Sequence, residues 1–184
     1  MDHQVKPSTS VGGFAFSSFV WEGLADMEIR RAEFKDIKGI MSLLYQVAEV
    51  HHKGRPDIFM GGASKYSESE LADIIVDNST PIFVAESDGD ILGHAFCVLK
   101  ERGENGVLVN HKSLYIDDIC VDENARGRHV GTALCKHVLA FAKEQSCYNV
   151  TLNVWTLNDG AMAFYRAMGF KEQKITMETI IDGK

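Results

Sequence analysis

Residues 158–170 read Asn-Asp-Gly-Ala-Met-Ala-Phe-Tyr-Arg-Ala-Met-Gly-Phe and carry the clearest structural signal in this chain. Apolar side chains recur with the i, i+3, i+4, i+7 spacing of one helix face, at Ala161, Phe164, Tyr165 and Met168. Gly169 follows directly, and glycine is the usual residue just past a helix end. The stretch therefore predicts a short amphipathic helix with a glycine cap, in which Phe164 and Met168 face a core.

One strand earlier, residues 121–132 read Val-Asp-Glu-Asn-Ala-Arg-Gly-Arg-His-Val-Gly-Thr. This pattern is typical of a turn from a strand into a helix. Free amides at a helix N-terminus bind phosphate oxygens, and the helix dipole favours their negative charge. Gly127 and Gly131 allow a close approach of the backbone, while Arg126 and Arg128 can add charge-assisted hydrogen bonds. Taken alone, the stretch is equally compatible with a solvated basic turn.

The spacing of apolar residues predicts the remaining elements of the chain. Strands are expected at 27–32, 82–86, 91–99, 113–121, 149–155 and 170–181, and helices at 36–51, 68–77, 130–145 and 161–168. Ser67 and Glu70 have the spacing of a capping box, and Asp88-Gly89 predicts a hairpin turn. Residues 101–110 are expected to form a polar loop. The alternation of strands and helices predicts an α/β layer fold.

Together the two stretches resemble the GNAT superfamily of acyl-coenzyme-A-dependent N-acetyltransferases. That family's loop reads Gln/Arg-x-x-Gly-x-Gly/Ala, and its later helix reads Asn-x-x-Ala-x-x-Phe-Tyr-x-x-x-Gly-Phe. The helix pattern is complete from Asn158 to Phe170, and the loop pattern matches at Arg126 and Gly131 but departs at His129, where glycine is usual. The resemblance covers residues 27–181. It implies a GNAT-like fold, a single mixed central β-sheet flanked by helices in the order βααβββαβαβ.

The resemblance also implies acetyl-CoA as the acyl donor and coenzyme A as the product. The pyrophosphate is expected on the loop and helix start, at Arg126, Gly127, Arg128, His129, Val130, Gly131 and Thr132. The pantetheine arm is expected along the strand edge at Ile119, Cys120 and Val121, much as a peptide adds to a sheet, with Asn158, Ala161 and Tyr165 beside it. We expect His129 to fit with a negative φ and its ring turned away from the phosphates.

The chemistry of amine acetylation requires a base, an oxyanion donor and an acid. An alkylammonium has a pKa of about 10.4, so the site must remove a proton before the amine can attack. Main-chain amides near Ile119 or Cys120 could stabilise the oxyanion. Tyr165 matches the family's usual proton donor for the departing thiolate, the alternative being a tyrosine packed in the core.

Two carboxylates interrupt the apolar strand 113–121. Successive strand residues face opposite sides, so we expect only one of Asp117 and Asp118 to face the acceptor. We expect Asp117 to be the base, directly or through a water molecule, and the alternative is a structural carboxylate. The acceptor is expected to contact segments 51–68 and 101–112. A non-catalytic acyl-CoA-binding sensor is the competing function, favoured by His129 and disfavoured by Tyr165 and Asp117.

Composition limits the class of protein further. The 184 residues fit one domain, and 45% apolar with 24% charged residues is the balance of a soluble globular protein. Apolar runs reach about five residues, far below the roughly 18 of a membrane span. The net charge of -7 disfavours nucleic-acid binding and favours a cationic amine acceptor.

The cysteines and the first residues give the last expectations. Cys97, Cys120, Cys135 and Cys147 lack metal-type spacing, so no metal site is expected, and buried free thiols suit a reducing cytoplasm. Residues 1–26 are interpreted as an extension or tag, with the acetyltransferase domain spanning 27–184. The aromatic residues of 1–26 could dock on a second copy, which would make a homodimer.

Overall fold

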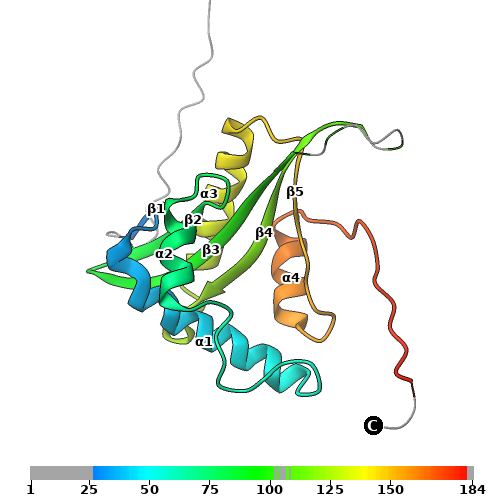
Figure 1. Cartoon of the computed structure of the whole chain (residues 1–184), viewed down its shortest axis with the longest axis horizontal. Helices are drawn as coiled ribbons and strands as arrows, with labels where there is room; N and C mark the ends of the chain where they lie inside the picture. Colours follow the sequence, from blue (N-terminus) through cyan, green and yellow to red (C-terminus); the bar gives the residue numbers. More distant parts are fainter. Residues whose placement is uncertain (1–26, 102, 104–106, 108, 182–184) are drawn as a thin grey trace, which may run out of the picture.

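A computed structural model describes residues 27–101, 103, 107 and 109–181, so the expectations for residues 1–26 lie outside the described residues. The described chain forms one mixed sheet in the order β1-β2-β3-β4-β5 (Figure 1). Neighbouring strands are antiparallel except β4 and β5, which are parallel. The strands are β1 (Glu28–Arg31), β2 (Ile82–Ser87), β3 (Asp90–Glu101), β4 (Lys112–Val121) and β5 (Asn149–Leu152).

Helices cover both faces of this sheet (Figure 1). Helices α1 (Ile37–Gly54) and α2 (Glu68–Val76) pack on one face, and α3 (Val130–Glu144) packs on the other. Helix α4 (Asp159–Ala167) follows β5, and short 3-10 turns occur at Phe34–Asp36 and Glu123–Ala125. No helix within the described residues is long and apolar enough to cross a membrane.

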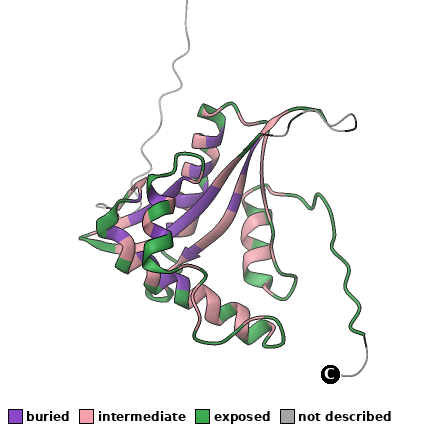
Figure 2. Ribbon diagram, in the orientation of Figure 1, coloured by how far each residue is buried: buried purple, intermediate pink, exposed green. Residues whose placement is uncertain are grey.

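The core lies on the two sides of β2 and β3 (Figure 2). Ile82 and Val84 pack with the buried residues of α1 and α2, whereas Phe83 and Ala85 pack with those of α3. This division follows from the two-residue period of a strand, and it explains why 82–85 is apolar without interruption. The thiols are free, with Cys97, Cys120 and Cys135 buried and Cys147 half-buried.

The local turn signals are confirmed. The amide of Glu70 donates to the Ser67 hydroxyl at 3.3 Å, and the amide of Ser67 donates to the Glu70 carboxylate at 2.8 Å, so both halves of the capping box form. Asp88 and Gly89 join β2 to β3 with φ values of 54° and 86°, as the tight hairpin turn requires.

The expected last strand, 170–181, is wrong. Residues 171–181 contain no strand and run along the outside of the molecule (Figure 1). The apolar side chains of its alternation, Ile175, Met177 and Ile181, are between 76% and 86% exposed. An alternating segment forms a strand only where it pairs with the edge of a sheet. In the structure β5 ends at Leu152, three residues earlier than expected. The observed order is βααβββαβα, and the mixed sheet flanked by helices is confirmed.

Candidate active site

The sheet opens between β4 and β5. Strand β5 pairs with β4 only from Ser113 to Ile116, whereas β4 continues along β3 to Val121. Among the described residues, no strand pairs with the other edge of β4 beyond Ile116. The amide of Asp122 donates to the Leu92 carbonyl of β3 at 2.9 Å, and successive amides of a strand point in opposite directions. The amides of Ile119 and Val121 therefore point to the open edge.

The loop after β4 places the N-terminus of α3 beside this opening. Gly127 has a φ of 77°, a left-handed conformation that glycine adopts without strain. The first backbone bond of the helix runs from the Ala133 amide to the His129 carbonyl at 3.0 Å. The amides of residues 130–132 precede that bond and belong to the end of the helix that attracts anions.

The expectation of a negative φ at His129 is wrong. This residue caps the N-terminus of α3 with a φ of 62° and a ψ of 11°. The cause is the shape of the turn, in which the chain reverses through two left-handed residues, Gly127 and His129, before the helix begins. A side chain in this conformation costs roughly 1–2 kcal/mol, although histidine tolerates it better than most residues.

We therefore expect His129→Gly to raise the free energy of unfolding by about 0.5–1 kcal/mol, because relief of backbone strain exceeds the added flexibility of the unfolded chain. Urea denaturation of the two proteins measures the difference. His129→Ala retains a Cβ and should show no gain. A glycine variant less stable than the wild type would mean that contacts of the imidazole outweigh the strain.

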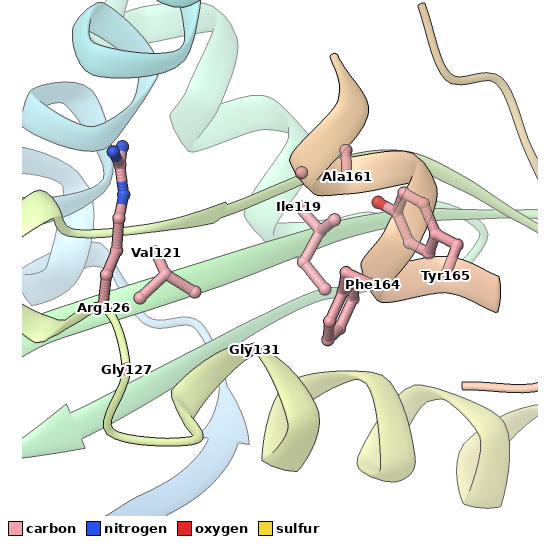
Figure 3. A pocket seen from close by; sticks show the side chains of 9 residues that line it. Ile119, Val121, Arg126, Gly127, Gly131, Ala161, Phe164 and Tyr165 are labelled. Atoms are coloured by element: carbon pink, nitrogen blue, oxygen red, sulfur yellow. The ribbon is translucent and has the colours of Figure 1, made fainter. Parts of the chain in front are cut away.

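A cavity of about 440 Å³ lies between the open edge of β4, the loop and α4 (Figure 3). Its lining residues are Ile119, Val121, Arg126, Gly127, Gly131, Gly160, Ala161, Phe164 and Tyr165. A second hollow of about 250 Å³ shares part of this lining and extends over the first turn of α3, at Ala125, His129, Val130 and Thr132. The two hollows form a continuous surface from the helix N-terminus to α4.

The structure brings most of the expected cofactor residues to these hollows and leaves three outside. Cys120 is buried on the other side of β4, where its thiol donates to the Leu43 carbonyl at 3.6 Å. The Asn158 side chain caps α4 by accepting from the Ala161 amide at 3.0 Å. Arg128 lines neither hollow.

Sequence reasoning missed Gly160 and placed Phe164 in the core. Both lie on the face of α4 that also carries Ala161, because residues four apart share a helix face. A Cβ at Gly131 would lie 3.4 Å from Val121 Cγ2 and 3.7 Å from the Phe164 ring, so β4, α3 and α4 come together around this residue. The sequence signal that could have found them was the four-residue spacing of Gly160 and Phe164, which puts both on one face of α4.

Tyr165 is held by the way α4 ends. The Phe170 amide donates to the Tyr165 carbonyl and the Gly169 amide to the Arg166 carbonyl, both at 3.0 Å, with Gly169 at a φ of 89°. This is the Schellman arrangement, which leaves the tyrosine on the last turn of the helix. The Tyr165 ring also meets the Phe170 ring edge-on, with centroids 5.6 Å apart.

The Tyr165 hydroxyl points toward the space between Ile119 and Ala161 (Figure 3). Burial raises the pKa of this phenol well above its ordinary value, and the charge of Asp118 adds to the shift. No described residue forms a hydrogen bond with the hydroxyl. The side chain is therefore a neutral phenol with a proton available toward the cavity.

Asp117 and Asp118 lie on the same face of the sheet, so the expectation that they face opposite sides is wrong. In the β3–β4 register Phe96 pairs with Asp118 and Cys97 with Ile116, which leaves Asp117 as an extra residue. Such a bulge sets two residues against one and breaks the simple alternation of side chains.

Asp118 is bound by a histidine that sequence reasoning missed. His94 on β3 is fully buried, and its Nε2 lies 2.7 Å from Asp118 Oδ2. Its Nδ1 has no hydrogen-bond partner among the described residues. The signal in the sequence was a single polar residue within the apolar run of 91–99. The side chain of Asp117 is 24% exposed and that of Asp118 is 12% exposed, so Asp117 is the more open carboxylate of the two.

Part of segment 51–68 reaches Asp117. The Lys65 ammonium lies 2.5 Å from Asp117 Oδ2, and the Tyr66 hydroxyl donates to the same oxygen at 3.1 Å. Elsewhere in the segment His52 Nδ1 lies 2.7 Å from the Phe59 carbonyl, and Arg55 pairs with carboxylates. Within the expected loop 101–112, residues 102, 104–106 and 108 lie outside the described residues.

The family model for the Acetyltransferase (GNAT) family matches residues 45–170, which is more than half of the sequence. The chain therefore belongs to the GNAT acetyltransferase family, whose members generally take the acetyl group from acetyl-CoA. Membership agrees with the open β4 edge and the helix N-terminus described above.

Curated relatives carry the names of N-acetyltransferases. N-acetyltransferase 8 of Rattus norvegicus is 31% identical over 123 residues, which are 65% of this chain and 52% of the relative. N-acetyltransferase 8B of Mus musculus is 34% identical over 90 residues, 49% of this chain and 37% of the relative. The chain thus spans about half the length of these relatives or less. Glucosamine 6-phosphate N-acetyltransferase of Trypanosoma brucei brucei is 26% identical over 160 residues, covering 84% of this chain and 95% of the relative.

Solved structures agree on the fold. A mutant of the BH1408 protein from Bacillus halodurans superposes with a TM-score of 0.81 at 28% identity, covering 84% of this chain and 99% of that one. An aminoglycoside acetyltransferase from an uncultured soil sample, meta-AAC0020, gives a TM-score of 0.64 at 21% identity over 85% of this chain and 97% of that one, which shows a shared fold alone.

Proposed function

We propose that this chain is an N-acetyltransferase that moves an acetyl group from acetyl-CoA to a primary amine of a small molecule or peptide. The observation that carries the proposal is the cavity bounded by the open edge of β4, the N-terminus of α3 and the Tyr165 phenol. This arrangement combines an anion site, an unpaired strand edge and a proton donor.

The residues present fit acetyl-CoA. Arg126 and the first amides of α3 suit a diphosphate, and the open amides of Ile119 and Val121 suit the amide groups of an extended arm. Gly131 leaves the backbone accessible between them. When bound, acetyl-CoA supplies a thioester whose carbonyl carbon accepts the amine.

Side chains and a main-chain amide of this chain carry out the proton transfers and stabilise the developing charge. Asp117 takes a proton from the acceptor ammonium, directly or through water, so that the amine becomes a nucleophile. The Ile119 amide, which points to the open edge, donates a hydrogen bond where negative charge develops on oxygen. Tyr165 gives its proton to the sulfur that leaves, and its raised pKa keeps that proton in place until then.

A thiol-release assay with acetyl-CoA tests the proposal. The amine series should include alkylamines, polyamines, aminoglycosides, hexosamine phosphates and lysine peptides. Release that depends on one class of amine supports the enzyme. Tight binding of acetyl-CoA without release for any amine would favour the alternative, an acyl-CoA sensor, for which His129 in the hollow over α3 is the supporting feature.

Arg126 should contribute more to this binding than Arg128, because only Arg126 lines the cavity. We expect Arg126→Ala to weaken acetyl-CoA binding about tenfold, equivalent to ~1.4 kcal/mol, through loss of a charge-assisted hydrogen bond. Thermal-shift titration measures both variants against the wild type. Arg128→Ala removes the same charge from the same loop, and an equal loss in both would assign the effect to general electrostatics.

A further inference from the structure

Lys65 makes an intramolecular contact that resembles a bound amine. Its ammonium lies 2.5 Å from Asp117 Oδ2 and 5.3 Å from the centre of the Tyr66 ring. The Tyr66 hydroxyl donates to the same carboxylate oxygen at 3.1 Å. A carboxylate beside an aromatic ring is a favourable environment for an ammonium group, since charge and ring quadrupole both attract it.

The walls of this ammonium subsite, defined here as Asp117 and Tyr66, are fixed in place. The half-buried Tyr66 ring stacks on Phe96, with centroids 5.6 Å apart and an interplanar angle of 20°. The Ser64 hydroxyl donates to the Tyr66 carbonyl at 3.0 Å, and the Ser67 capping box begins α2 immediately afterwards. Asp117 is held in the β4 bulge. The subsite therefore persists when its occupant changes.

The occupant, in contrast, can leave. Lys65 is 45% exposed and carries its charge at the end of a four-carbon chain, so rotation of the side chain alone removes it. Burial by itself lowers the pKa of this ammonium, but the hydrogen bond and the charge of Asp117 outweigh that effect and raise the pKa. Lys65 is thus a charged occupant rather than a free nucleophile.

The neighbouring charged groups are already engaged. Asp118 is bound by His94, and the Lys100 ammonium lies over the Tyr115 ring, 3.7 Å from its centre. The Tyr115 hydroxyl accepts from Asn153 at 3.0 Å. Asp117 is consequently the carboxylate of this region that can exchange one cation for another.

We propose that Lys65 occupies the subsite for the acceptor's ammonium group, and that the acceptor is a primary ammonium on an unbranched alkyl chain that displaces it. The inference rests on the proposed function, since it takes Asp117 to be the group that meets the acceptor. The side chain of lysine is itself a primary ammonium on an unbranched alkyl chain. An acceptor that carries this group can therefore make the contacts that Lys65 makes with the subsite. Acceptor binding then competes with an internal ion pair.

Direct binding tests the competition without any turnover. The probe is Nα-acetyl-lysine methylamide, and its neutral counterpart is Nα-acetyl-norleucine methylamide, which lacks only the ammonium. We expect Lys65→Met to bind the lysine probe at least fivefold more tightly than the wild type by isothermal titration, because the internal competitor is gone. The norleucine probe should show no such gain.

Lys35→Met is the matched control, since Lys35 is 63% exposed, pairs with Glu33 outside segment 51–68 and removes the same charge. Lys65→Arg keeps a cation and should retain wild-type affinity, and Lys65→Gln repeats the comparison if the methionine variant does not fold. Equal or weaker binding in Lys65→Met, or no binding in any variant, overturns the inference. Tighter binding without thiol release for any amine would leave the subsite standing and refute the proposed enzyme.

Discussion

Tyr165→Phe should lower kcat for a basic amine by about 100-fold while changing the affinity for acetyl-CoA by less than about twofold. The substitution keeps the ring that packs against Phe170 and removes only the hydroxyl that faces the cavity. Loss of the proton donor makes the thiolate a poorer leaving group, so the effect appears in the chemical step. Steady-state thiol release and equilibrium titration together measure it.

The tyrosine control is Tyr148→Phe, at an exposed residue whose ring contacts His111 away from the cavity, and it should be neutral. The raised pKa of Tyr165 also predicts how the wild-type rate depends on pH. A phenol whose pKa lies above the usual ~10 stays protonated through pH 9, so the wild-type rate should not fall on that side of neutrality for want of the acid. Near-normal turnover in the phenylalanine variant would assign Tyr165 to packing.

Asp117→Asn should lower kcat/KM at pH 7 by about 100-fold, and the deficit should shrink as pH rises. Below its pKa of ~10.4, an alkylamine gains about tenfold in free base for each pH unit. A site without a base can use only amine that has already lost its proton to the solvent, so its rate follows that gain. The variant's rate should therefore climb more steeply with pH than that of the wild type. Rate profiles from pH 6.5 to 9.5 measure the two slopes.

Asp73→Asn changes the same charge at an exposed position on α2 and should leave the profile unaltered. A profile for Asp117→Asn that is only scaled down, with the wild-type slope, would indicate that Asp117 organises Lys65 and Tyr66 rather than accepting a proton. The ammonium subsite predicts in addition that KM for a cationic amine rises in this variant, which separate values of kcat and KM would show.

The elements around the cavity could be predicted because their signals are local. Helix spacing and Gly169 fixed the end of α4, and therefore the turn that carries Tyr165. The glycine spacing after Val121 located the N-terminus of α3 within one residue. Each of these features depends on a few neighbouring residues, which is the range over which periodicity and capping act.

The features that sequence reasoning missed depend on contacts between distant segments. The bulge that turns Asp117 and Asp118 to one face is defined by register against β3. The pair of His94 with Asp118 joins two strands, and neither residue carries a mark of its partner. The prediction of a strand at 170–181 was wrong because alternation alone does not make a strand. Within the described residues, 171–181 pairs with no edge of the sheet.

We expect acetyl-CoA to bind between the open edge of β4 and the N-terminus of α3. Titration of the isotope-labelled protein with acetyl-CoA, followed through amide chemical shifts, tests it residue by residue. We expect the largest changes at the amides of Ile119, Val121, Gly127, Val130, Gly131 and Thr132, with little change at the amides of α2. Saturable binding that leaves these amides unshifted and perturbs another surface would contradict it.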